Sequence, residues 1–466
     1  MNTGAEIDLD ITNVAHGGVF VGRHEGRVIF APDTLPGERV RVRLTETGKA
    51  SFWRAETLEV LDESPHRLPH IWPDADISVA PELRPGGADF GHIALAHQRE
   101  LKKFVLADSL QRMAGLDVDL EIKPAGSTEP GAASADEESL DGSGWRTRLS
   151  LHVDENGKVG PYAARSHRVI EVGSHPLAAP GLESVALTLQ GLEPGRIDLV
   201  QGADGMIRLL QRPETTGRRG SAGAVTAESV APAPTGAARG KGKAKGKGRR
   251  VRTRPAAAPV DPQLFATLIE RVGEREFQMD AGGFWQVHRL APATLTAAVQ
   301  AAVATVDFDA EASNLDLYGG VGLLAAALGD VGGAATRVTS IESDARATDH
   351  AGENLAEWVG ARAETSRVDH YLTRLLAEGT PIERSRLRRG TVVLDPPRSG
   401  AGAAVVRSLA RVQPEAVIYV ACDPVALARD VATFAEEGYS LRSVTAYDLF
   451  PNSHHVEAVA VLSLSR

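Results

Sequence analysis

The chain has few of the features that mark exported, membrane or metal-binding proteins. Its 466 residues include one cysteine, which excludes an internal disulfide, a zinc site of several thiolates and a cluster held by several thiolates. No run of about eighteen apolar residues occurs, and acids stand at the N-terminus where a signal peptide carries Lys or Arg. These absences predict a cytoplasmic protein with no membrane partner.

Positive charge is also scarce overall. The formal net charge is −10, whereas nucleic-acid binders usually present a basic surface. The average hides an uneven distribution, because residues 212–254 hold about a dozen Lys and Arg with only Glu214 and Glu228 among them. A nucleic-acid partner would therefore need local basic patches on a chain that is otherwise acidic.

Composition divides the first half of the chain into three parts. Residues 1–62 alternate polar and apolar positions between Gly-rich turns, which predicts a small β-barrel. Residues 63–211 contain an amphipathic helical pattern at 94–115 and a strand-rich stretch at 145–172, which predicts a small α+β central domain. Residues 212–258 are too poor in apolar residues to offset ordering entropy, so we expect a disordered basic insertion, either merely solvated or in contact with RNA.

The last part, residues 259–466, changes to apolar strands separated by helical stretches. This alternation predicts an α/β fold with an open, mostly parallel sheet, which binds ligands beyond the carboxyl ends of its strands. The predicted strands are 314–318, 338–342, 365–369, 391–395, 417–421, 442–447 and 456–464.

Two of these strands lead into features that suit a nucleoside. The segment Asn-Leu-Asp-Leu-Tyr-Gly-Gly-Val-Gly, residues 314–322, runs from a strand into a Gly-rich turn, where a ligand can approach the backbone. Glu342 ends the next strand, where a carboxylate can accept hydrogen bonds from ribose hydroxyls, although it could equally cap a helix. Together they predict an adenosine pocket without separating a dinucleotide from S-adenosylmethionine.

Three later strands carry reactive groups. Asp395 begins Asp-Pro-Pro-Arg, whose prolines stiffen the loop and turn the carboxylate toward the cleft, unless the motif is only a tight turn. Cys422 directly follows the strand 417–421, so the only thiol lies at the ligand-binding rim, unless it acts as a small buried apolar residue. Glu457 leads into the last strand, where a solvated carboxylate is the alternative.

Four longer motifs surround these residues and occur in a fixed order. They read Asp-Leu-Tyr-Gly-Gly-Val-Gly, Leu-Asp-Pro-Pro-Arg-Ser-Gly, Tyr-Val-Ala-Cys-Asp-Pro-Val-Ala-Leu-Ala-Arg-Asp and Phe-Pro-Asn-Ser-His-His-Val-Glu-Ala-Val. Together they resemble the signature of the TrmA/RumA-type RNA (uracil-5-)-methyltransferase family. Residues 277–288 resemble the family's entry into the catalytic domain, and residues 5–60 resemble its TRAM domain, an RNA-binding barrel. The resemblance implies a Rossmann-like class I methyltransferase sheet of seven strands in the order 3-2-1-4-5-7-6, with the last strand antiparallel.

The resemblance also implies a reaction, namely methyl transfer from S-adenosylmethionine to carbon 5 of a uridine in tRNA or rRNA. The thiolate of Cys422 would add to carbon 6, and Glu457 would remove the proton from carbon 5. The uridine would have to leave its stack, so a loop or unpaired site is the expected substrate. No metal and no obligate protein partner are expected. The positions that match the family's cofactor pocket are Gln286, Tyr318, Gly320, Glu342, Asp369 and Asp395.

Several positions depart from the family pattern. Ala421 and Asp423 stand where Ser and Asn are more common, and His288 stands where Asn is usual. A negative charge on Asp423 would raise the pKa of the neighbouring thiol unless a hydrogen bond offsets it. Some relatives carry an iron–sulfur cluster between the barrel and the catalytic half, but residues 66–98 contain no cysteine, so no cluster is expected.

Two other functions stay open on the sequence. An amino-group nucleic-acid methyltransferase would use Asp-Pro-Pro and would need neither Cys422 nor Glu457. A non-catalytic RNA-binding protein with a degenerate methyltransferase domain would account for Ala421 and Asp423.

Overall fold

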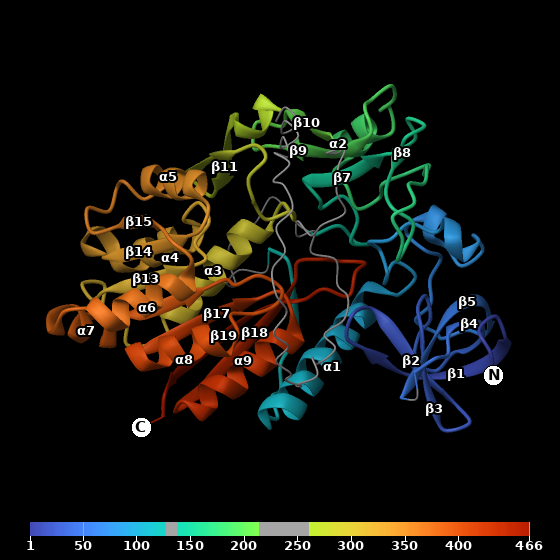
Figure 1. Cartoon of the computed structure of the whole chain (residues 1–466), viewed down its shortest axis with the longest axis horizontal. Helices are drawn as coiled ribbons and strands as arrows, with labels where there is room; N and C mark the ends of the chain where they lie inside the picture. Colours follow the sequence, from blue (N-terminus) through green and yellow to red (C-terminus); the bar gives the residue numbers. More distant parts are fainter. Residues whose placement is uncertain (50, 127–137, 214–260, 466) are drawn as a thin grey trace, which may run out of the picture.

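The computed structural model describes residues 1–49, 51–126, 138–213 and 261–465 (Figure 1). The basic insertion expected at 212–258 lies outside these residues except for its first two. Among the described residues, no helix combines the length and apolar composition needed to cross a bilayer.

The N-terminal part is a closed five-stranded barrel, drawn in blue in Figure 1. Burial alternates along its strands, because every second side chain points into the barrel. The interior is packed with apolar residues such as Leu9, Phe20 and Val42. The barrel expected from the sequence is therefore confirmed. Its strands, in the spatial order β1-β2-β3-β5-β4, are β1 (Glu6–Ala15), β2 (Val19–His24), β3 (Arg27–Ala31), β4 (Arg39–Glu46) and β5 (Phe52–Asp62).

The central part contains a long helix and a small antiparallel sheet. Helix α1 (Leu95–Ala114) matches the expected helix at 94–115. The sheet has the order β10-β9-β7-β8 and is covered on one side by the short helix α2 (Pro180–Ala186). Only two regular strands lie within the expected strand-rich stretch 145–172. The strands of this sheet are β7 (Arg148–Val153), β8 (Val159–Gly160), β9 (Gly195–Gln201) and β10 (Ile207–Pro213), and short 3-10 turns precede α1 at Pro73–Ala75 and Pro81–Leu83.

The C-terminal part is built on one large sheet with the strand order β15-β14-β13-β16-β17-β19-β18-β6. Its first seven strands reproduce the expected order 3-2-1-4-5-7-6, and β19 runs antiparallel to both of its neighbours. The strands are β13 (Asn314–Leu317), β14 (Val338–Glu342), β15 (Arg362–Thr365), β16 (Thr391–Leu394), β17 (Ala416–Ala421), β18 (Tyr439–Asp448) and β19 (Glu457–Leu464).

Two apolar layers cover the two faces of this sheet. One layer comes mainly from α3 and α4, and the other from α1, α6, α8 and α9. A hairpin of β11 (Thr267–Val272) and β12 (Arg275–Asp280), preceded by a 3-10 turn at Pro262–Phe265, leads into the sheet domain. The helices are α3 (Ala291–Val303), α4 (Leu323–Gly332), α5 (Ala345–Asn354), α6 (Val368–Glu378), α7 (Pro381–Arg388), α8 (Ala403–Val412) and α9 (Pro424–Glu436).

Two features of the large sheet differ from expectation. The strand expected at 365–369 is wrong, because β15 ends at Thr365 and α6 begins at Val368, whose apolar face continues with Tyr371 and Leu372 at helical spacing. An eighth strand, β6 (Ile122–Pro124), comes from the central part and pairs in parallel with β18. Helix α1 packs against α9 beside it, so the central part contributes to the large sheet and to one of the helix layers that cover it.

Candidate active site

The reactive residues expected from the sequence gather at one edge of the large sheet. Parallel strands β16 and β17 end there with Asp395 and Cys422, and antiparallel β19 begins there with Glu457. Ala421 pairs with Ala458 in the ladder between β17 and β19, so the thiol and the Glu457 carboxyl leave adjacent strands side by side. The fold therefore brings the expected nucleophile and the expected base together.

The Cys422 thiol is half-buried, and its surroundings favour the neutral form. Burial raises the pKa of this thiol, and the nearby carboxyl groups of Glu457 and Asp395 raise it further. Arg398, which follows the two prolines of the Asp395 motif, lowers the pKa but does not outweigh them. Cys422 is thus a thiol rather than a thiolate at neutral pH.

Burial also raises the pKa values of the carboxyl groups at this edge. The pKa of Glu457 lies well above its usual value because of burial, and Asp395 adds to the rise. Burial raises the pKa of Asp395 to about 7, and Asp316 in β13 contributes. Asp316 itself has a pKa raised to about 7 by burial, against the hydrogen bond that it accepts from Ser340. Glu457, the expected base, is therefore harder to ionise than an exposed carboxyl group.

The Gly-rich turn between β13 and α4 is open above its backbone. Tyr318 has a φ of 65° and Gly320 a φ of 54°, so the chain turns sharply through the left-handed region. A Cβ at Gly319 would collide with Asp316, whereas one at Gly320 would meet nothing within 4 Å. Glu342 lies beside this open turn, where its carboxylate accepts the Gly320 amide at 3.2 Å. An open backbone next to an anchored carboxylate fits an adenosyl group.

Of the other expected cofactor residues, Asp369 lies close to this turn, and within the described part of the chain Gln286 makes no contact with it through a hydrogen bond. Asp369 lies in the first turn of α6, is paired with Arg367 at 3.0 Å, and is close enough to Tyr318 to contribute to its raised pKa. Burial is the larger cause of that rise, to about 12. Gln286 lies between β12 and α3 and, among the described residues, makes no hydrogen bond with this group. Its place in the pocket stays a prediction.

Comparisons with known proteins decide the family. Residues 362–465 match the family described as tRNA (Uracil-5-)-methyltransferase, and residues 2–53 match the TRAM domain. A protein of Streptomyces avermitilis named as an uncharacterised RNA methyltransferase is 37% identical over 98% of this chain and 98% of its own. The chain belongs to the RNA (uracil-5-)-methyltransferase family.

One further relative and one solved structure are also similar to this chain. The 23S rRNA (uracil(1939)-C(5))-methyltransferase of Shewanella denitrificans is 27% identical over 99% of this chain and 96% of its own. The tRNA (uracil-54, C5)-methyltransferase of Pyrococcus abyssi, in complex with S-adenosyl-L-homocysteine, shares the fold with a TM-score of 0.63 and 18% identity, covering 98% of this chain and 100% of that one. By family, the protein is therefore an RNA (uracil-5-)-methyltransferase.

The barrel of this methyltransferase reaches the loop that carries the nucleophile. Asp423 caps α9 by accepting the Ala426 amide at 2.8 Å on one oxygen, and its other oxygen accepts His16 Nε2 at 2.8 Å. The sequence predicted that a hydrogen bond would be needed to offset the charge of Asp423, and these two bonds exist. His16 was not among the expected site residues, because the two partners lie 407 positions apart.

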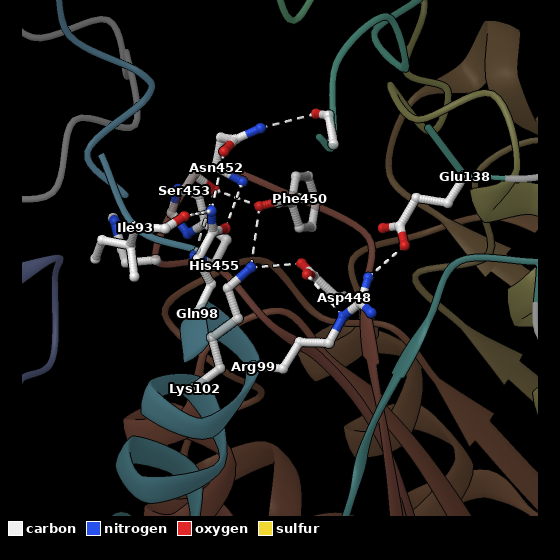
Figure 2. Close-up of polar contacts among 12 residues, drawn as sticks. Ile93, Gln98, Arg99, Lys102, Glu138, Asp448, Phe450, Asn452, Ser453 and His455 are labelled. Atoms are coloured by element: carbon white, nitrogen blue, oxygen red, sulfur yellow. Dashed lines mark hydrogen bonds and ion pairs between the residues drawn. The ribbon is translucent and has the colours of Figure 1, made fainter. Parts of the chain in front are cut away.

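The motif at 450–457 of the methyltransferase is held in place by α1 (Figure 2). Lys102 Nζ donates to Asp448 at 2.5 Å and to the Phe450 carbonyl at 3.0 Å, and both charged side chains are fully buried. Gln98 and Asn452 exchange two hydrogen bonds of 2.8 and 2.9 Å. This contact fixes the segment that leads into Glu457.

A basic cavity lies where the central sheet meets the methyltransferase domain. It has a volume of about 430 Å³, and its walls include Arg146, Arg148, Arg196 and Arg212, together with Asp198, which pairs with Arg196 and Arg212. Within the described parts of the chain, the Arg146 guanidinium has no acidic partner; it lies over Trp145, and burial followed by repulsion from Arg398 lowers its pKa to about 10. That repulsion places Arg146 near the active site. The sequence did not identify the residues of this cavity; it indicated only that an RNA-binding protein of this charge would need a local basic patch.

Proposed function

We propose that this methyltransferase modifies a uridine of tRNA or rRNA through a covalent adduct with Cys422, and that Glu457 is the base that completes the reaction. The observation that carries the proposal is the meeting of both side chains on adjacent strands, β17 and β19. An amino-group methyltransferase would need neither residue, and a protein without catalysis would have no reason to pair them.

The reaction then follows from the chemistry of these two groups. The Cys422 sulfur forms a bond to carbon 6 of the ring, and the ring electrons move to carbon 5 and the neighbouring carbonyl. Carbon 5 takes the methyl group and still carries its proton. Glu457 accepts that proton, the bond between sulfur and carbon 6 breaks, and its electron pair returns to the sulfur as thiolate.

This sequence of events requires proton movements at the site. Cys422 begins as a thiol and must lose a proton before it can add to the ring. Glu457, whose pKa is raised by burial, must be ionised when the proton leaves carbon 5. S-adenosylmethionine, when bound, supplies the methyl group and a positive sulfonium charge. Positive charge at this edge, to which Arg398 already contributes, favours the ionised forms of both groups.

The cofactor is proposed to lie over the Gly-rich turn. Its support is the open backbone at Gly320 and the Glu342 carboxylate beside it. Asp369 and Tyr318 flank the same turn, and Asp395 lies at the next strand end, between the turn and the thiol. Gln286 remains part of the proposal on the resemblance alone.

The RNA is proposed to approach through the basic cavity and the barrel. Arg146, which has no acidic partner among the described residues, lies near Arg398, and Arg27 lies over the Trp53 ring on the barrel at 4.5 Å. Unpaired bases stack on such aromatic and guanidinium surfaces. A uridine in a loop would flip out of its stack to reach Cys422, which is only half-buried at the strand end.

We also infer a cytoplasmic enzyme that acts without an obligate protein partner and without an iron–sulfur cluster. The single cysteine and the RNA substrate class support this location. The four sequence parts, 1–62, 63–211, 212–258 and 259–466, are proposed as barrel, central domain, insertion and catalytic domain.

The test is a covalent trap. The protein is incubated with S-adenosylmethionine and tRNA or rRNA transcripts that contain 5-fluorouridine, and a denaturing gel is used to detect an adduct. Fluorine at carbon 5 cannot leave as a proton does, so a uridine-5 enzyme is held on the RNA after methyl transfer. The expected result is an adduct with wild type and none with Cys422→Ala.

The controls separate the alternatives. Cofactor binding by Cys422→Ala, measured by calorimetry, shows that this variant is folded. Methyl transfer that persists in Cys422→Ala would support an amino-group methyltransferase. Cofactor and RNA binding without transfer in wild type would support a non-catalytic RNA-binding protein.

A further inference from the structure

The turn between β1 and β2 of the barrel lies directly against the nucleophile loop. Ala15, His16 and Gly17 from this turn, together with Cys422, Asp423 and His454, line a space of only about 10 Å³, which is about the size of one water molecule. A Cβ at Gly18 would collide with the Asp89 carboxylate and the His454 ring. The barrel is therefore in close contact with the catalytic domain at this point.

Asp423 is the group through which this contact reaches the thiol. It is adjacent to Cys422 in sequence, and its charge raises the pKa of the thiol in addition to the larger effects of burial, Glu457 and Asp395. Burial acts to raise the pKa of Asp423 itself, but hydrogen bonds from His16 and the Ala426 amide outweigh it, and the pKa lies below its usual value. Asp423 is thus a carboxylate at neutral pH, and one of its hydrogen bonds goes to the barrel.

Among the described residues, the other basic side chains around the nucleophile loop do not bond to Asp423. His454 turns its Nδ1 to Asp89 at 2.6 Å, and burial, followed by the proximity of His454, lowers the pKa of His455 to about 2, which leaves its ring neutral. Lys102 is committed to Asp448. Within the described part of the chain, His16 is the side chain that forms an ion pair with Asp423.

We propose that His16 is a positioning residue for methyl transfer, which holds the Asp423 carboxylate toward the barrel and screens its charge from the Cys422 sulfur. The proposal rests on the role of Cys422 as nucleophile. Without His16, the Asp423 oxygen that faced the barrel loses its partner and its charge acts on the thiol unscreened. The RNA-binding barrel then contributes to the reactivity of the nucleophile as well as to RNA binding.

The test uses the fact that Cys422 is the only cysteine of the chain. Iodoacetamide labelling of the full-length enzyme without RNA therefore reports on this thiol alone. A higher thiol pKa lowers the thiolate fraction more than it raises the nucleophilicity of the remaining thiolate. His16→Ala should therefore be labelled more slowly than wild type at pH 8, by roughly threefold for each unit by which the thiol pKa rises.

Variants of Asp423 distinguish screening from a general structural role. Asp423→Asn removes the charge that His16 screens, so the double variant His16→Ala with Asp423→Asn should be labelled as fast as Asp423→Asn alone. His16→Gln, which keeps a hydrogen-bond donor at this position, should fall between wild type and His16→Ala. His24→Ala, a barrel histidine on β2, is the matched control and should leave the rate unchanged.

Three results would overturn the proposal. They are an unchanged rate in His16→Ala, a faster rate, which would mean that His16 shields the thiol, and a slow rate that persists in the double variant. The adduct with 5-fluorouridine RNA keeps the two proposals apart. If wild type forms no adduct while the labelling pattern holds, the role of Cys422 as nucleophile fails but the screening by His16 stands.

Discussion

Replacing Lys102 by methionine tests whether α1 holds the active-site segment through a buried charge. The ammonium donates to Asp448 and to the Phe450 carbonyl, and the side chains of Lys102 and Asp448 are both 0% exposed. Methionine has a similar length but no charge, so Lys102→Met leaves the Asp448 carboxylate with Arg99 alone, at 3.3 Å.

The magnitude follows from the burial of the pair. Removing one partner of a buried ion pair costs about 3–5 kcal/mol, and the remaining Arg99 places Lys102→Met at the lower end, about 3 kcal/mol. For a domain of roughly 150–250 residues this corresponds to a fall in Tm of about 6–12 °C. Scanning calorimetry is the assay, because it resolves the transition of the catalytic domain from that of the barrel.

The chain offers a matched control one residue away. Lys103 Nζ lies 3.2 Å from Asp119, whose side chain is 98% exposed, so Lys103→Met should cost less than about 1 kcal/mol. Lys102→Met combined with Asp448→Leu should recover much of the lost Tm, because an apolar pair can replace a buried ion pair. Equal Tm values for Lys102→Met and Lys103→Met would refute the reasoning.

Four further predictions follow from the site. Glu457→Gln should accumulate a methylated covalent adduct on ordinary uridine RNA, seen on a denaturing gel, because the proton at carbon 5 has no base. Labelling of Cys422 in the ligand-free enzyme should keep rising through pH 9 to 10, because burial and the nearby carboxyl groups raise its pKa; a plateau near pH 8.5, the ordinary thiol pKa, would contradict this. Burial raises the pKa of Glu270 to about 7, so the folded state is less stable once the pH rises through that value. Urea titrations at pH 5 and pH 8 measure this loss of unfolding free energy. The loss between the two pH values should be roughly 2–3 kcal/mol smaller in Glu270→Gln than in wild type. Arg146→Ala should weaken RNA binding and reduce the slope of log Kd against log salt by roughly 0.7–0.9.

The parts of the fold that repeat a local pattern could be predicted from the sequence. The barrel and α1 follow from alternation and helical spacing, whereas the order of the seven strands was implied by the resemblance to a known family. The short edge strand β15 (Arg362–Thr365) was placed too late, because its residues are mostly polar and the apolar signal at 368–372 belongs to a helix. Strand β6 could not be foreseen, because three residues carry no periodicity and its partner β18 lies more than 300 residues away.

The candidate site shows the same division between local and distant effects. Cys422, Asp395 and Glu457 could be named because each stands beside a strand end in a recognisable motif. The raised pKa of Glu457 could not be predicted, since it depends on burial and on the neighbouring Asp395. The His16 contact with Asp423 depends on how the barrel packs, which no local pattern encodes.

Strand β6 has a consequence for how the molecule can be divided. It covers the outer edge of β18, whose backbone groups would otherwise be free to pair with another chain. A C-terminal fragment that starts at residue 261 would lack this strand and the α1 surface that packs on α9. It would therefore expose the unpaired edge of β18 and an apolar face of α9. The natural unit for truncation or for reassembly from two co-expressed pieces is therefore not the methyltransferase sheet alone, but that sheet together with the segment from α1 through β6.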